Sequence, residues 1–317
     1  MLSALLAGFA AVRRNPGLVL VVLGTNLLLG LLVAVPLVLR LEADLSSRGA
    51  GSAMMYAFDY DWWTEWSERQ EGPSSALGPG FLGTGFALRN LDALLDGALP
   101  AGLFGRSGLD PAILGAGLLY ALLQVFLTGG LVGVFRAPRG GFSARSLVHG
   151  SGFYFGRMLR VSLLALAAAG AVFALHRPLA RFTADLAREA VSGRTALLLT
   201  LGSQALLLLA LVLVHMVASH AKVLVVREER LSAVLAVLGG LGFCARNLPA
   251  ALGEYAAVGA AGVLLLALFA AADARLVVVG WRSQIVALAL FQAFVAGRIA
   301  LRLGLLASQL ELQERRR

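Results

Sequence analysis

Long apolar runs separated by short charged connections make up most of the chain. Six such runs contain few or no charged side chains, and they cover residues 17–39, 113–135, 158–175, 196–226, 254–272 and 283–306. A helix rises 1.5 Å per residue, so about 20 residues cross the roughly 30 Å hydrocarbon core of a bilayer. The pattern predicts an all-α, polytopic membrane protein with six transmembrane helices in a single membrane domain, residues 1–317.

A short phrase recurs before the first, third and fifth runs. In each copy a Gly-Phe pair is followed three or four residues later by arginine, at residues 8–16, 152–160 and 242–249. Residues 1–12, ahead of the first run, are too few to span a bilayer but place their leucines on one helical face. We therefore expect three copies of one unit, in which an interfacial helix and a kink precede an outward and a returning span. The six spans would then form three antiparallel hairpins with cytoplasmic interfacial helices.

The composition agrees with a protein that lies in lipid. The chain is 59% hydrophobic and 14% charged, whereas soluble domains carry about 25% charged residues. The formal net charge is +9, but the basic side chains gather at the ends of the apolar runs. Topology and anionic lipid headgroups explain that placement better than nucleic acid does, because no basic face with interleaved aromatic residues is present. The expected partner is the lipid bilayer, with no nucleic acid.

The distribution of basic residues also predicts an orientation. The N-terminus, the 136–160 and 222–249 connections and the chain end from residue 298 onward carry 16 Lys and Arg, against six in the 176–194 and 273–282 connections. By the positive-inside rule both termini are cytoplasmic. The expected location is the bacterial cytoplasmic (inner) membrane. Cys244, the lone cysteine, then lies on the reducing side.

Residues 40–110 form a long insertion between the first two spans, and the orientation makes it extracytoplasmic. The insertion holds ten acidic and five basic residues. Its aromatic cluster, Tyr60, Trp62, Trp63 and Trp66, suits membrane anchoring, bundle packing or contact with a membrane or periplasmic partner protein. Residues 86–99 have the spacing of an amphipathic helix. The carboxylates between residues 59 and 68 leave a weaker alternative, acid–base catalysis, without a histidine or nucleophile motif beside them.

Several polar side chains lie inside the apolar runs and are the candidate ligand residues. Uncharged ones would form interhelical hydrogen bonds or line a polar path; they are Asn26, Gln124, Gln204, His215 and Gln292. Arg298 and Arg302 are four residues apart on one face. They could extend to the headgroup region, bind an anionic lipid headgroup or substrate, or pair with Glu254 or the glutamates at 228 and 229.

No metal or cofactor is expected. His215 and His220 are five residues apart on one helix, which separates them by about 140° around its axis, whereas metal ligands on one helix face need a spacing of three or four. A chain with one cysteine also excludes a multi-cysteine metal site.

Three segments resemble a class of poorly characterised bacterial six-span proteins. They are residues 221–230 (AKVLVVREER), 243–249 (FCARNLP) and 301–309 (LRLGLLASQ). The class includes the YciC-type inner-membrane proteins and the membrane domain fused to some glycerophosphodiester phosphodiesterases. The resemblance covers the spans and their connections and not residues 40–110. It implies a fold and no activity.

The sequence favours a non-enzymatic function. We expect an integral membrane scaffold or accessory subunit that binds a partner protein or lipid. A transporter or permease subunit with a polar path between the spans is the alternative. A lipid-modifying enzyme that uses the carboxylates of the insertion is the weakest of the three hypotheses.

Overall fold

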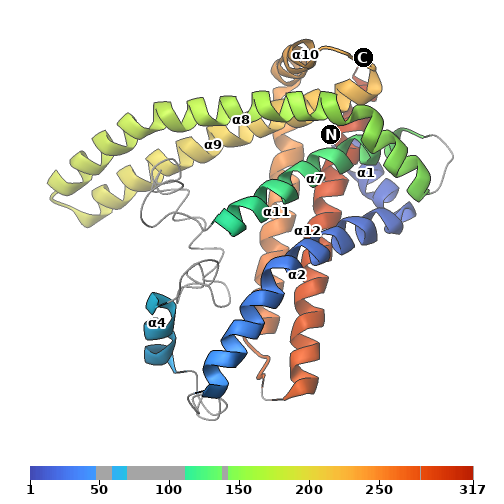
Figure 1. Ribbon diagram of the computed structural model, residues 1–317. Helices are drawn as coiled ribbons and strands as arrows, with labels where there is room; N and C mark the ends of the chain where they lie inside the picture. The colour runs from blue at the N-terminus through green and yellow to red at the C-terminus, as the bar shows by residue number, and fades with distance from the viewer. Residues whose placement is uncertain (48–58, 70–110, 138–141, 279, 317) are drawn as a thin grey trace. The chain divides into compact units, whose positions relative to one another are not determined.

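The described part of the chain is built from helices. The computed structural model describes residues 1–47, 59–69, 111–137, 142–278 and 280–316, and within these ranges it contains no strand. The helices are α1 (Leu2–Arg14), α2 (Pro16–Ser47), α4 (Tyr60–Arg69), α7 (Pro111–Arg136), α8 (Ala144–Glu189), α9 (Gly193–Arg227), α10 (Ala233–Arg246), α11 (Leu248–Asp273) and α12 (Trp281–Arg315) (Figure 1).

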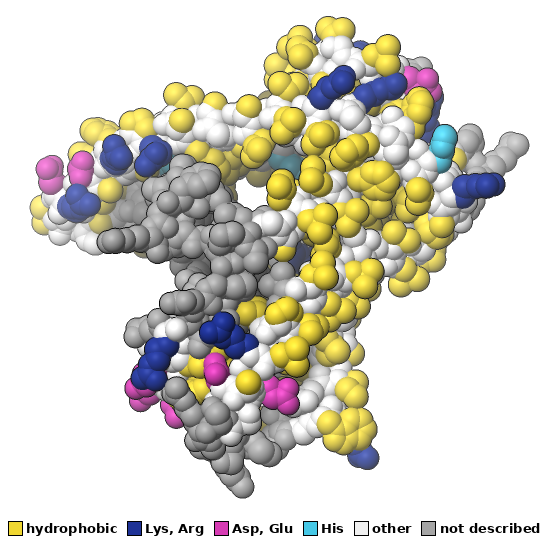
Figure 2. All heavy atoms as spheres, in the orientation of Figure 1, with side chains coloured by type: hydrophobic (Ala, Val, Ile, Leu, Met, Phe, Trp, Pro, Cys, Tyr) yellow, Lys and Arg dark blue, Asp and Glu magenta, His cyan; other side chains and the backbone are white. Residues whose placement is uncertain are grey.

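Six of these helices are long and apolar enough to cross a membrane: α2, α7, α8, α9, α11 and α12. Their surfaces carry large apolar side chains, such as Leu28, Leu166 and Val263, which are 68%, 70% and 69% exposed. Figure 2 shows hydrophobic side chains along long stretches of the helices. So much exposed apolar surface is stable only against lipid. The chain is therefore an all-α polytopic membrane protein, as predicted.

The helices are divided between two compact units. Unit 1 comprises Met1–Leu20, Leu122–Leu264 and Gly297–Arg317, and unit 2 comprises Val21–Ala121 and Leu265–Ala296. In unit 1, α8 and α9 pack side by side and are joined by residues 190–192 (Figure 1). In unit 2, Phe269 of α11 stacks on Phe294 of α12 with ring centroids 4.6 Å apart. The arrangement of all six spans as three hairpins stays a prediction.

Two short helices, α1 and α10, lead into long helices through similar elbows. Each ends at an asparagine, Asn15 or Asn247, whose side-chain amide donates a hydrogen bond to the carbonyl four residues earlier. The distances are 2.9 Å from Asn15 Nδ2 to the Ala11 oxygen and 3.1 Å from Asn247 Nδ2 to the Phe243 oxygen. Each asparagine carbonyl then accepts a 3.0 Å bond from the first turn of the following helix. With 13 and 14 residues, α1 and α10 are too short to span a bilayer.

The buried faces of α1 and α10 also correspond. Counted back from the elbow asparagine, positions 11, 7 and 3 are buried in both helices. They are Ala4, Gly8 and Val12 in α1, and Ala236, Gly240 and Cys244 in α10. The glycine of each trio lies against the backbone of a long helix. A Cβ on Gly8 would lie 2.5 Å from the Ser308 nitrogen of α12, and one on Gly240 would lie 2.7 Å from the Val217 oxygen of α9.

The middle copy of the phrase behaves differently. Residues 152–160 lie inside α8, which continues without a break for 46 residues. The helix does not break there, because the copy contains neither asparagine nor proline to interrupt the helical hydrogen bonds. The polar loop expected at 176–194 is also wrong, since α8 extends to Glu189. Arg177, Arg181, Asp185 and Arg188 recur at helical spacing there, and Arg188 pairs with Asp185 at 2.9 Å.

Close contact between α7 and α8 uses glycines. Gly130 of α7 lies against the Leu147 carbonyl and the Ser151 hydroxyl of α8, and Gly150 of α8 lies against Gly130 in turn. Gly129 faces Tyr154, whereas Gly133 has open space beside it. Of these two glycines, which are four residues apart in α7, Gly129 alone lies at the contact with α8.

Helix α2 continues to Ser47, into the polar segment 40–110. Within the insertion the structure describes α4, and the helix expected at residues 86–99 lies outside the described residues.

Candidate functional site

The polar side chains of unit 1 concentrate on the second half of α9. His215, Ser219 and Lys222 follow at spacings of four and three residues, which places them on one face of the helix. Lipid offers no hydrogen-bond partners, and the residues around these three on α9 are apolar. The polar groups therefore need partners from other helices. His215 finds its partner on α11 and Ser219 finds its partner on α12.

A chain of four polar side chains joins α9, α11 and α12. His215 Nδ1 lies 2.8 Å from the Tyr255 hydroxyl, and Gln309 Nε2 donates to the same hydroxyl at 3.4 Å. Ser219 Oγ donates to Gln309 Oε1 at 2.5 Å.

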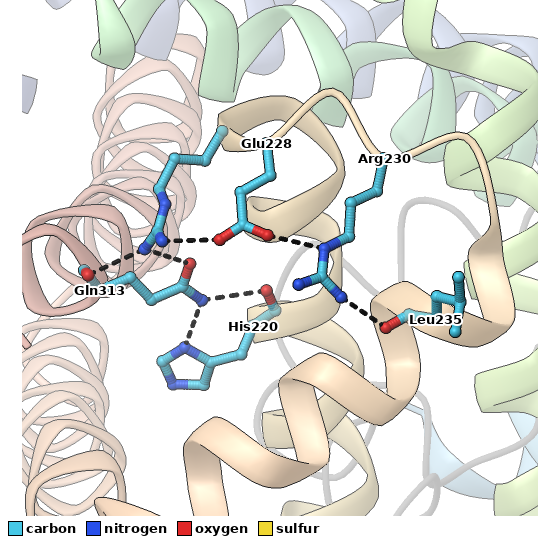
Figure 3. Close-up of polar contacts among 6 residues, drawn as sticks. His220, Glu228, Arg230, Leu235 and Gln313 are labelled. Carbon is cyan, nitrogen blue, oxygen red and sulfur yellow. Dashed lines mark hydrogen bonds and ion pairs between the residues drawn. The ribbon is translucent and has the colours of Figure 1, made fainter. Parts of the chain in front are cut away.

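A second network begins one residue beyond Ser219 (Figure 3). Gln313 Nε2 donates to His220 Nδ1 and to the His220 carbonyl, both at 3.0 Å. Arg227 donates to the Gln313 carbonyl at 2.8 Å and to Glu228 Oε1 at 2.7 Å. Glu228 Oε2 in turn accepts a 2.7 Å bond from Arg230 Nε. This network holds the C-terminal end of α9 to α12.

Two arginines from other helices also bind the α9–α10 connection, and together with Arg227 and Arg230 they form a clamp around it. Arg136 at the end of α7 donates to the Val226 carbonyl at 2.8 Å and lies 3.7 Å from Glu229. Arg157 of α8 donates to the Glu229 carbonyl at 3.4 Å. The Glu229 backbone has a φ of 54°, in the left-handed region that non-glycine residues rarely adopt. The arginines stabilise this turn by occupying its carbonyl groups.

A third group of polar side chains is positively charged. Arg302 of α12 donates to Gln124 Oε1 of α7 at 2.7 Å. Lys222 lies on the same face of α9 as His215 and Ser219. Gln124 is buried, Lys222 is half-buried, and Arg302 and His215 are exposed.

Glu254 is the acidic side chain buried in a span of unit 1. It lies in the second turn of α11 and is 0% exposed. Neither carboxylate oxygen has a hydrogen-bond partner in the described residues, although the N-terminal amine of Met1 and Ser308 of α12 lie near it. The alternative that Arg302 pairs with Glu228, Glu229 or Glu254 is wrong, because those glutamates have other neighbours and Arg302 binds Gln124.

The predicted path residues separate between the two units. Gln124, Gln204 and His215 belong to unit 1, and Asn26 and Gln292 belong to unit 2. The structure joins Gln124 to Arg302 and His215 to Tyr255, and Gln204 lies half-buried, 11 residues before His215 on α9. Arg298 is exposed one turn before Arg302.

The aromatic cluster lies on α4 in unit 2. Trp63 and Trp66 are each 6% exposed, and Trp66 Nε1 donates to Asp44 Oδ2 of α2 at 2.7 Å. Trp62 is half-buried and stacks on Trp66, whereas Tyr60 is 58% exposed. Of the nearby carboxylates, Asp59 accepts a bond from the Trp62 backbone and Glu65 pairs with Arg69. The tryptophans therefore pack the segment, and Tyr60 is the most exposed of the four aromatic side chains.

Sequence reasoning missed Tyr255, Gln309 and Gln313 as members of these networks. The signal was present on α9, where His215, Ser219 and Lys222 share one face. The spacing of His215 and His220 does not reveal this face, because the two histidines belong to different networks. Among the described residues, no group of three His, Cys, Asp or Glu lies together as metal ligands would.

Comparison of the chain with protein-family models, curated proteins and solved structures found no match. The fold and the interhelical networks define the class of protein, an α-helical polytopic membrane protein.

Proposed function

We propose that this protein is a non-enzymatic membrane scaffold or accessory subunit that binds a partner protein or lipid. The observation that carries the proposal is the chain from His215 through Tyr255 and Gln309 to Ser219. These groups hydrogen-bond to one another across three helices, where a catalytic site would direct them toward a substrate. Interhelical hydrogen bonds in membranes stabilise by about 0.6 kcal/mol on average, so a set of them fixes the relative positions of helices.

The arrangement at the end of α9 supports the same function. Arginines from α7, α8 and α9 bind carbonyl and carboxylate oxygens around one connection. Such a clamp gives a rigid frame on which a partner or lipid can bind without reordering the helices, which lowers the entropic cost of association.

The test is extraction of the tagged protein with its surrounding lipid, followed by mass spectrometry of the proteins and lipids that co-purify. A scaffold retains a partner protein or a lipid in fixed ratio to the chain. The matched variant carries a Gly/Ser linker in place of residues 48–110. If the insertion binds the partner protein, that protein is lost from the variant while lipid is retained. A wild-type chain that carries only bulk lipid contradicts the proposal.

A permease is the alternative, and Glu254 favours it. An acidic side chain buried in a span without a hydrogen bond in the described residues is the kind of group that carries protons or cations in transporters. The test is flux across proteoliposomes under an imposed proton or sodium gradient. A permease shows gradient-dependent uptake that Glu254→Gln abolishes, and equal fluxes in protein-containing and empty vesicles exclude this function.

The orientation belongs to the same proposal. Both termini lie in the cytoplasm of a bacterial cell, in the inner membrane, and residues 40–110 lie on the outer side, because 16 basic residues lie on the side of the termini and six in the connections opposite. The proposal also includes the threefold sequence repeat at residues 8–16, 152–160 and 242–249 and the similarity to YciC-type proteins. Tags at each terminus, probed in intact and in permeabilised cells, test the orientation; a terminus labelled in intact cells contradicts it.

A further inference from the structure

Glu254 lies where three helices of unit 1 meet. A core cluster nearer the helix ends contains one residue from each of α1, α11 and α12: Ala4, Ala250 and Leu312. Residues four apart lie on the same face of a helix, so the next layer consists of Gly8, Glu254 and Ser308. The contact between α1 and α12 in this layer is direct, because a Cβ on Gly8 would lie 2.5 Å from the Ser308 nitrogen.

Helix α1 covers this layer on both sides. The thioether of Met1 lies against Gly253, the residue before Glu254. The ring of Phe9 lies against Gly304, one turn before Ser308 on α12. Beneath α1 the side chain of Glu254 is 0% exposed. Water can therefore reach the carboxyl group only if α1 moves.

The surroundings of Glu254 suit a neutral carboxyl group. Neither oxygen has a hydrogen-bond partner among the residues that the structure describes, and a buried carboxylate without partners is costly. The facing hydroxyl of Ser308 donates to the Leu305 carbonyl at 2.9 Å, so toward Glu254 it has lone pairs and no proton to offer. A carboxylate, which also has lone pairs alone, gains nothing from this neighbour. A protonated carboxyl group can donate to it.

The ionisable groups around Glu254 leave one competitor for the proton. The amine of Met1 lies near the carboxyl group and favours its ionised form. The other helices that pack around this turn contribute four ionisable side chains: Tyr255 of α11, Cys244 of α10, His220 of α9 and Glu311 of α12. Glu311 pairs with Arg315 at 2.7 Å, His220 accepts a hydrogen bond on Nδ1, and the phenol and thiol are neutral near pH 7.

We propose that Glu254 is a proton-binding site closed by α1. The carboxyl group holds its proton while α1 is docked, and it releases the proton to water on the side of the membrane where α1 lies when α1 lifts away from α11 and α12. The elbow at Asn15 is the hinge for this movement. A proton suits the site better than a metal ion does, because a metal ion needs several oxygen ligands and the close approach of Gly8 to Ser308 leaves little volume for it.

The experiment follows the infrared carbonyl band of protonated carboxyl groups in the full-length protein, titrated from about pH 5 to about pH 10. Glu254→Gln keeps the shape of the neutral carboxyl group and cannot ionise. The matched control is Glu189→Gln, which removes an exposed carboxyl group at the end of α8. We expect a band that persists near pH 7 in the wild type and the control and is absent from Glu254→Gln. A band of equal size in all three proteins overturns the proposal.

Closure by α1 is tested with two glycine variants. The methyl group of Gly8→Ala would lie 2.5 Å from the Ser308 nitrogen and push α1 away, so we expect the band to titrate at least about one pH unit lower, which is a tenfold weaker hold on the proton. Gly242→Ala of α10, which meets no neighbouring atom, should titrate like the wild type. Equal titrations of the two variants overturn the closure.

The reciprocal measurement is hydrogen exchange of the α1 amides at about pH 6 and about pH 9, corrected for the intrinsic exchange rate. Protection of α1 should fall at the higher pH in the wild type and stay constant in Glu254→Gln. The same pH dependence in both proteins overturns the coupling.

A chain extended by a Gly-Ser segment before Met1 separates the proton from the amine, because the extension carries the amine away from Glu254. We expect the extended chain to show the same infrared band as the wild type. A band that appears only in the extended chain would mean that Glu254 is ionised and paired with the amine, which overturns the proposal. Since none of these measurements involves a bound partner or a flux, the proton site can fail or succeed independently of the scaffold and the permease.

Discussion

The elbows that follow α1 and α10 and the uninterrupted helix α8 are three outcomes of a similar sequence phrase. Both elbows contain an asparagine that turns its side chain back onto the preceding helix and its carbonyl forward onto the next one. The corresponding part of α8, around Arg160, lacks asparagine and proline and stays helical. The glycine, phenylalanine and arginine that define the phrase therefore do not make the bend. Asparagine with a nearby proline makes it.

The comparison also changes how the copies should be aligned. An alignment on the recurring Gly-Phe pair matches Gly8 with Gly242. An alignment on the elbow asparagines matches Gly8 with Gly240, since each lies seven residues before its asparagine. Gly240 is buried against α9, and Gly242 has open space around it. Contact with a long helix, rather than proximity to phenylalanine, is what the two glycines share.

The largest effect is expected from a proline placed in α8. Arg160→Pro removes a backbone donor and introduces a clash with the carbonyl four residues earlier, at a cost of about 3 kcal/mol or more in an uninterrupted helix. Thermal unfolding in detergent measures the loss. The control is Pro16→Ala, because a proline in the first turn of α2 removes no helical hydrogen bond, and this change should cost less than about 1 kcal/mol. Equal losses in the two variants would show that α8 already bends at this point.

A smaller effect with opposite signs is expected from two glycines of α10. Gly240→Ala places a methyl group 2.7 Å from the Val217 carbonyl oxygen, so the helices must separate, and we expect destabilisation of about 1–3 kcal/mol. Gly242→Ala meets no neighbouring atom and should stabilise the helix by up to about 1 kcal/mol. The thermal unfolding midpoints of the two variants, compared with that of the wild type, test these opposite signs. A stabilising Gly240→Ala contradicts the packing of α10 on α9.

The elbow asparagines should each contribute about 1 kcal/mol, the usual net value of one hydrogen bond. Asn15→Ala and Asn247→Ala both remove the bond to the preceding helix, and Asn247→Ala also removes an acceptor for Arg316, 3.0 Å away. Limited proteolysis at the elbows and thermal unfolding report the loss. Ser46→Ala, which removes an exposed bond within α2, is the control and should change stability by less than about 0.5 kcal/mol. Asparagine variants that are as stable as this control would show that the elbow hydrogen bonds do not contribute to stability.

The smallest expected effect is a pH dependence of the free energy of unfolding, which is expected for the elbow after α10 and not for the elbow after α1. Burial raises the pKa of the Cys244 thiol from 9.0 to about 11, whereas the matching position in α1 is Val12, which does not titrate. The folded state then holds the thiol proton more tightly than the unfolded state. Its contribution to stability is complete below pH 9 and is lost as the pH rises through about 11.

The measurement is the difference in unfolding free energy between the wild type and Cys244→Val at pH 8 and at pH 10.5. The wild type should lose stability relative to the variant as the pH rises. A difference that stays constant across this interval would mean that the thiol is solvated.

The spans could be read from the sequence because their signal is local. The start of α7 follows from Pro111, the extension of α9 follows from apolar residues that continue to Val226, and the short helix before Pro16 follows from the spacing of its leucines. The end of α8 was missed for a related reason. Arginine and aspartate at helical spacing are typical of an exposed helix as well as of a loop, and composition alone does not separate the two.

The candidate site was predicted in part. Arg302, Gln124 and His215 stand out because polar side chains are rare in apolar runs, and the structure joins Arg302 to Gln124 and His215 to Tyr255. The partners of His215 and Ser219 do not stand out. Tyr255 and Gln309 are ordinary residues for a helix end.

The sequence by itself determined that this chain lies in lipid and how many helices can cross the membrane. Both depend on the composition of single runs of about 20 residues. Only the tertiary structure decided that Gln313 binds His220, 93 residues earlier, and that Arg302 binds Gln124, 178 residues earlier. The rotation of each helix about its axis selects which polar groups face one another, and that rotation is set by contacts such as Gly8 on α12 and Gly240 on α9.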